Sequence, residues 1–111
     1  MHIYLKYFIV FMGIRKSLLQ AKKMIKRGTD YSQISSLILY TIKPEIERAK
    51  EESKKLYNMI SGLDGLYVRI GNMKGYIDKN DFKGALVWVD KAIKKIDEIR
   101  KLDISIYVKE T

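Results

Sequence analysis

The sequence predicts an all-α fold, a compact bundle of four to five helices built from two helical hairpins. Apolar residues recur at spacings of three and four along most of the chain, which is the period of an amphipathic helix. Two turn sequences, Gly28-Thr29-Asp30 and Asn80-Asp81, each precede an aromatic residue and a new apolar stripe. The length of 111 residues suits one hydrophobic core, so we expect a single domain over residues 1–111, with a β-prone segment at either terminus as the one exception.

The first segment, residues 1–14, is the most apolar part of the chain. It is shorter than the roughly 20 residues that cross a bilayer, and Lys6 interrupts it. Arg15-Lys16 follow where a secretory signal would carry small residues, so we expect a cytoplasmic protein. A core helix or a buried strand is the favoured interpretation. A membrane-surface anchor, or a natural start at Met12, would be the alternatives.

The first hairpin is expected over residues 15–60, and its first helix is strongly basic. Six cations fall within an arc of about 140° at 100° per residue, opposite a narrow apolar stripe. They are Arg15, Lys16, Lys22, Lys23, Lys26 and Arg27. Of the net charge of +9, residues 1–30 carry +6, from seven bases and one acid. The arc predicts either a solvated helix face or a nucleic-acid-binding surface for phosphates, and an anionic membrane surface is a weaker third interpretation.

The second helix of this hairpin starts near Tyr31 and meets Pro44, where we expect a kink or a restart because proline has no backbone donor. Several glutamates follow Pro44. Carboxylates of this kind bind metal in helical bundles mostly together with histidines on the inner face, and the only histidine is His2. We therefore predict no metal site.

A loop is expected at 61–65, between the two hairpins, because Gly62 and Gly65 lie there. The second hairpin is expected over 66–102. Residues 66–78 have helical apolar spacing, although Gly71 and Gly75 each cost a helix about 1 kcal/mol. A β-hairpin turning at Gly71 is the alternative for 66–77.

Residues 79–102 form the clearest amphipathic helix. Asp81 is the expected N-cap, because its carboxylate can accept hydrogen bonds from the unpaired amides of the first turn. The apolar stripe comprises Phe82, Ala85, Leu86, Val89, Ala92, Ile93, Ile96 and Ile99. In the tail, residues 103–111, Ile104–Val108 alternates in hydrophobicity and is predicted as a short strand.

Residues 76–93 resemble the second half of a tetratricopeptide-repeat hairpin. The likeness is carried by Tyr76, Asn80-Asp81-Phe82, Ala85-Leu86, Val89 and Ala92-Ile93. In that family a small-residue turn precedes an aromatic residue, and two alanines seven apart let neighbouring helices approach closely. Met73 departs from the pattern, because the family has a small residue there. The resemblance implies a helical hairpin and a partner-binding role, whereas a solenoid needs about three units and this chain has room for two.

No catalytic residue and no cofactor are predicted. The glycines match no phosphate-binding loop, and no histidine is placed to activate a serine. Val87 and Trp88 lie beside the apolar stripe and are candidates for a protein interface. The sequence therefore favours a small basic non-enzymatic interaction module that helps assemble a nucleic-acid-associated complex. The alternative is a protein–protein adaptor or a self-assembling subunit that binds no nucleic acid.

Overall fold

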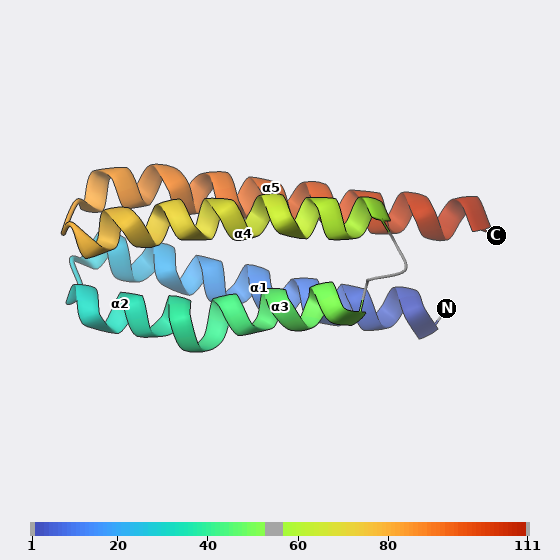
Figure 1. The fold of residues 1–111 in the computed structure, drawn as a ribbon, viewed down its shortest axis with the longest axis horizontal. Helices are drawn as coiled ribbons and strands as arrows, with labels where there is room; N and C mark the ends of the chain where they lie inside the picture. Colours follow the sequence, from blue (N-terminus) through green and yellow to red (C-terminus); the bar gives the residue numbers. More distant parts are fainter. Residues whose placement is uncertain (1, 53–56, 111) are drawn as a thin grey trace.

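Four helical rods run side by side along the molecule (Figure 1). The structure, a computed structural model, describes the backbone of residues 2–52 and 57–110 and the side chains of 10–52 and 61–101. The rods are α1 (His2–Arg27), the unbroken series α2 (Tyr31–Leu37), η1 (Ile38–Ile42) and α3 (Lys43–Glu52), then α4 (Tyr57–Asp78) and α5 (Phe82–Glu110). The bundle measures 47 × 21 × 19 Å. The all-α fold class and the two predicted hairpins are confirmed.

Each rod packs against two neighbours. Helix α5 lies between α4 and α1, and the α2–η1–α3 rod lies between α1 and α4. The turns within the two hairpins are at one end of the bundle, and both ends of the chain are at the other (Figure 1). Neighbouring rods are therefore antiparallel, in an up-down-up-down order.

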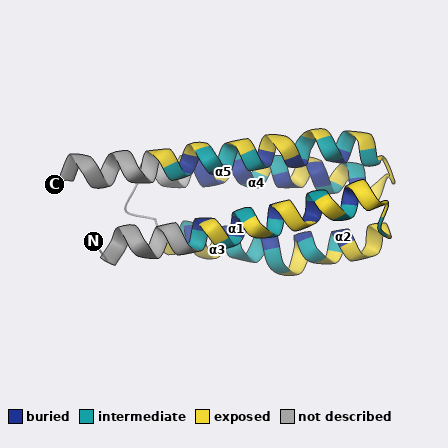
Figure 2. Ribbon diagram, turned by 180° about the vertical axis from the view of Figure 1, so that it is seen from behind, coloured by how far each residue is buried: buried dark blue, intermediate teal, exposed yellow. Residues whose placement is uncertain are grey.

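The core is formed by one apolar stripe from each rod (Figure 2). Its larger members are fully buried: Phe11, Ile14, Leu18, Ile34, Ile38, Ile42, Ile46, Leu63, Leu66, Ile70 and Met73. Helix α5 contributes a stripe that includes two alanines: Ala85, Val89, Ala92, Ile96 and Ile99. Burying each large side chain contributes roughly 1.5–3 kcal/mol, so this stripe pattern is the main source of stability.

The turn from α1 to α2 is set by three residues. Gly28 has a φ of +70°, and the Thr29 amide donates to the Met24 carbonyl at 3.0 Å, which closes a Schellman motif. The Asp30 carboxylate then accepts from the Ser32 amide at 3.3 Å and caps α2. The helix end and the new helix start that the sequence predicts here are confirmed.

The turn from α4 to α5 has the same combination of left-handed residue, backbone hydrogen bond and aspartate cap, but the cap is one residue closer to the left-handed residue. Asn80 has a φ of +60°, and the Asp81 amide donates to the Tyr76 carbonyl at 2.8 Å. The Asp81 carboxylate accepts from the Gly84 amide at 3.0 Å, so the predicted N-cap is confirmed.

A π-helical turn, η1, lets the chain pass Pro44 without a break. In a regular α-helix the Pro44 ring would clash with the Tyr40 carbonyl. That carbonyl would also lack a hydrogen-bond donor, because proline has no backbone N–H. The Lys43 amide instead donates to the Ile38 carbonyl, five residues earlier in the chain, and the helix is wider at this turn. Residues spaced four apart rotate gradually around an α-helix, because one turn takes 3.6 residues. The wider π-helical turn offsets this rotation, so four isoleucines spaced four apart all lie in the core: Ile34, Ile38, Ile42 and Ile46.

The loop expected at 61–65 is wrong, because α4 runs through these residues. A Cβ atom on Gly62 would lie 2.9 Å from Ile99 Cγ1, so Gly62 marks a close approach of α4 to α5 rather than a turn. The chain passes from α3 to α4 through 53–56, which lie outside the described residues. The first hairpin therefore ends earlier than the predicted 15–60, and α4 begins at Tyr57.

The β-structure alternatives are also wrong. Residues 66–77 belong to α4, as the favoured interpretation had it, and α5 continues to Glu110 through the predicted strand Ile104–Val108. At the other terminus, α1 begins at His2, so residues 2–14 are helical and not a strand. Each residue added to the end of an existing helix gains one backbone hydrogen bond. This gain outweighs the modest β-preference of a short segment.

Substituting two glycines tests the packing of α4 against α5. A Cβ atom on Gly84 would overlap the Tyr76 ring, whereas nothing lies within 4 Å of a Cβ atom on Gly71. We expect Gly84→Ala to lower the free energy of unfolding by about 1–3 kcal/mol, because the ring must move. The matched Gly71→Ala should raise it by about 0.4–1 kcal/mol. Urea unfolding followed by circular dichroism measures both, and equal changes would contradict the close approach.

A carboxylate joins the ends of the two hairpins. Asp78 accepts from Lys74 Nζ at 2.6 Å and from Ser35 Oγ of α2 at 3.2 Å. The Lys74 hydrogen bond is the main cause that holds the pKa of Asp78 below its ordinary value of 3.8, with the Ser35 bond adding to it and burial opposing it.

The lowered pKa predicts an acid-sensitive contribution to stability. Since the folded pKa lies below the unfolded one, the contribution is complete above pH 3.8 and is lost as the pH falls through the folded pKa. Asp78→Asn should cost roughly 0.2–1 kcal/mol at pH 7, because the pair is solvent-exposed, and should cost nothing once the wild-type carboxylate is protonated. Denaturant unfolding of both proteins from pH 7 to pH 2 measures this, and a constant difference across that range would exclude it.

Candidate functional site

The structure divides the six predicted cations of α1 into two groups. Arg15 Nε lies 2.9 Å from Asp97 Oδ1, and Lys22 Nζ lies 2.8 Å from Asp90 Oδ1. Both carboxylates belong to α5. These two ion pairs form a seam along the contact between α1 and α5, so the charges of Arg15 and Lys22 are already paired within the bundle.

The other four cations of the arc point to solvent. Lys16, Lys23, Lys26 and Arg27 are exposed, and within the described part of the chain none of them takes part in an ion pair. Their charges are therefore available to a ligand. Sequence periodicity places all six cations on one side of α1. The two groups can be distinguished only in the folded bundle, because carboxylates of α5 pair with Arg15 and Lys22.

Helix α5 adds a second row of exposed cations: Lys83, Lys91, Lys94 and Lys101. At 100° per residue these four lie on the side of α5 away from its buried stripe. Lys83, Lys94 and Lys101 are next to the seam residues, and Lys91 is on the side toward α4. Helices α1 and α5 lie side by side on the near side of the molecule in Figure 2. We call the two rows together the basic face: Lys16, Lys23, Lys26 and Arg27 of α1, and Lys83, Lys91, Lys94 and Lys101 of α5.

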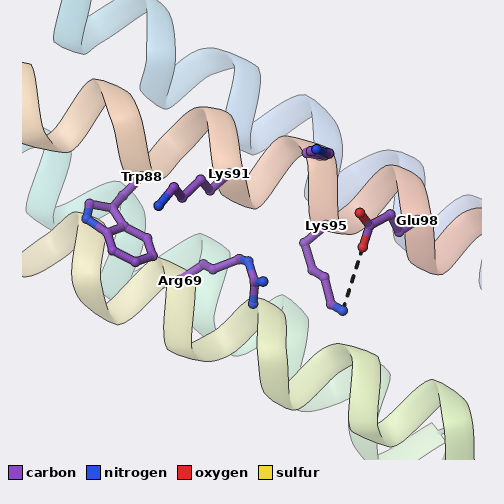
Figure 3. Close-up of a pocket in the computed structure, with 6 residues that line it drawn as sticks. Arg69, Trp88, Lys91, Lys95 and Glu98 are labelled. Carbon is purple, nitrogen blue, oxygen red and sulfur yellow. Dashed lines mark ion pairs between the residues drawn. The ribbon is translucent and has the colours of Figure 1, made fainter.

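A groove between α4 and α5 borders the basic face (Figure 3). Its lining residues are Arg69 of α4 and five residues of α5: Trp88, Lys91, Lys94, Lys95 and Glu98. Lys91 Nζ lies 4.3 Å from the centre of the Trp88 ring, a cation–π contact, and Lys95 Nζ lies 3.7 Å from Glu98 Oε2. Lys91 and Lys94 belong to both the groove and the basic face.

The two residues predicted as a protein interface differ in their surroundings. Val87 is 52% exposed, whereas Trp88 is half-buried, packs against the core and lines the groove. The groove was not predicted from the sequence, because Arg69 lies on another helix. The only indication of the groove in the sequence is the group of lysines that follows Trp88.

Among the described residues there is no group of three or more potential metal ligands. No helix in that part of the chain is long and apolar enough to span a bilayer.

The chain matches no protein-family model, no curated protein and no solved structure.

A double-mutant cycle should separate seam cations from exposed ones. Lys22→Ala and Asp90→Ala are expected to couple by roughly 0.2–1 kcal/mol in the free energy of unfolding, because each removes the same exposed ion pair. Lys23→Ala with Asp90→Ala is the matched control and should show no coupling. Urea unfolding of the singles and doubles measures both cycles, and equal coupling in the two would contradict the seam.

Proposed function

We propose that this chain is a small, non-enzymatic module that binds the phosphate backbone of nucleic acid through the basic face. The observation that carries the proposal is the double row of exposed cations on two adjacent helices. Bound in this way, the module would help to assemble a nucleic-acid-associated complex, and we place that role in the cytoplasm.

The dimensions of the basic face suit a nucleic-acid backbone. Lys83 to Lys101 spans 18 residues of helix, which is about 27 Å at 1.5 Å per residue. Duplex DNA has one phosphate per strand for about every 3.4 Å of its helix axis, so this length corresponds to about eight phosphates of each strand. Eight cations over that distance supply a comparable density of positive charge.

The seam makes the basic face more attractive to phosphate. Asp90 and Asp97 would repel an approaching backbone if they were unpaired. Each already has a cation within hydrogen-bond distance, so their charges are locally balanced and the exposed cations dominate the field.

Four acids of the first hairpin lie on α3, the rod that is diagonally opposite α5 in the bundle. Helix α3 carries Glu45, Glu47, Glu51 and Glu52, and it packs against α1 and α4. A net charge of +9 distributed in this uneven way would orient the molecule as it approaches a polyanion.

A protein–protein adaptor or a homo-oligomer is the second candidate. Val87 at 52% and Leu19 at 37% are large apolar side chains exposed on α5 and α1. A partner protein that covers them would remove their apolar surface from water. The resemblance to a tetratricopeptide-repeat hairpin fits this candidate as well.

A charge reversal on the basic face tests the first candidate. Lys23 is exposed on α1, and Arg48 is exposed on α3 and serves as the matched control, since either reversal to Glu lowers the net charge by two. We expect Lys23→Glu to weaken oligonucleotide binding several-fold and to reduce the slope of log K against log salt by about one, because one phosphate contact is lost. Arg48→Glu should change both far less. Fluorescence anisotropy across a salt series provides the measurement.

Two outcomes would contradict the proposal. Equal losses from the two reversals would mean that net charge alone attracts the oligonucleotide. Binding that disappears at physiological salt would mean that the basic face is an ordinary solvated surface, and a self-association seen by sedimentation would then favour the second candidate.

A further inference from the structure

We infer that the groove between α4 and α5 binds an unpaired nucleotide of a single strand, with its base stacked on Trp88 and its phosphates held by Arg69 and the lysines of α5. This inference rests on the proposed function, since it names the form of nucleic acid that the molecule prefers.

The groove has the size and the shape for such a unit. Its volume is about 300 Å³, at the lower end of the range for small-ligand sites. Gly65 of α4 helps to keep it open, because a Cβ atom there would lie 3.2 Å from Lys95 Cε and 3.3 Å from Arg69 Nη1. Figure 3 shows the Arg69 side chain on the α4 side of the groove, with Trp88 and Lys91 of α5 at one end and its guanidinium extending toward Lys95 at the other.

Trp88 provides a stacking surface that is held in place. The residue packs against the core and also lines the groove. Its buried part therefore holds the indole in position, and its other part is exposed to solvent. Every base has a π-face, and stacking on a fixed aromatic ring is how single strands are bound without sequence preference. Lys91 Nζ, which lies 4.3 Å from the ring centre, is on a long exposed side chain that can turn to a phosphate when a base arrives.

The charges around the ring favour phosphate. Four cations line the groove against one carboxylate, that of Glu98. The Arg69 guanidinium is oriented by a hydrogen bond that Nη1 donates to the Gly65 carbonyl at 2.9 Å. Its further N–H groups can donate to a phosphate in the fork geometry that suits oxyanions.

A single strand fits this arrangement better than a duplex. In a duplex the bases are stacked on one another, so a half-buried ring between two helices cannot meet a base face. A single strand that runs along the basic face reaches the groove at Lys91 and Lys94, which belong to both surfaces. It can then turn one base onto Trp88.

The chain has one tryptophan, so its fluorescence reports on this groove alone. We would titrate the full chain with a short oligothymidylate, with a duplex of the same length and with inorganic tripolyphosphate, and record tryptophan emission and, for the oligonucleotides, anisotropy. Stacking predicts quenching by the single strand and little change with the duplex or tripolyphosphate. Trp88→Leu should weaken single-strand binding about 5- to 150-fold, the range for losing one stacked base, and Trp88→Phe should retain most of the affinity.

Arg69→Gln provides a second variant that leaves the tryptophan and the core in place. It should weaken single-strand binding several-fold and change duplex binding much less. Unchanged emission while anisotropy reports binding would overturn the groove inference, and a continuing effect of Lys23→Glu would show that the basic face still binds. Failure of every oligonucleotide to bind would overturn the inference and the proposed function together.

Discussion

The packing of α5 against both α1 and α4 is the interaction on which the rest of this structure depends. Its buried stripe contains Ala85 and Ala92, whose small side chains let neighbouring rods come close. Gly62 and Gly84 allow the same close approach between α4 and α5. Because α5 packs between α1 and α4, the three sides of α5 outside its buried stripe have different roles. One side forms the seam with α1, one borders the groove with α4, and the outermost carries exposed lysines.

The first hairpin solves a different problem, which is to pass a proline within a rod that must stay packed. A sharp kink at Pro44 would carry the following apolar residues away from the core. The π-helical turn η1 gives the backbone room for the proline ring and also resets the phase of the stripe. Ile42 and Ile46 are therefore buried on either side of the proline, and α3 continues along α1 and α4.

Electrostatics in this molecule follow from packing more than from composition. The excess of cations is evident in the sequence, but ion pairs across the seam use Arg15 and Lys22 to balance two carboxylates of α5. What is left exposed is a selected subset, and it lies on the same side as the lysines of α5. The same helix brings its tryptophan beside Arg69 of α4. A polyanion and an unstacked base are the chemical groups that such a surface and groove would suit together.

The sequence by itself determined the helices and the ends of the hairpin turns. Apolar spacing, the left-handed Gly28 and Asn80 and the caps Asp30 and Asp81 act over a few residues, so they can be found without a structure. The loop expected at 61–65 and the strand expected at 104–108 failed because helix packing and helix extension outweigh local propensity.

The tertiary structure alone decided which cations are exposed and where the groove lies. Arg15 and Asp97 are 82 residues apart in the chain, and Arg69 and Trp88 lie on different helices. Contacts at such separations depend on how the rods pack, and no local pattern encodes them.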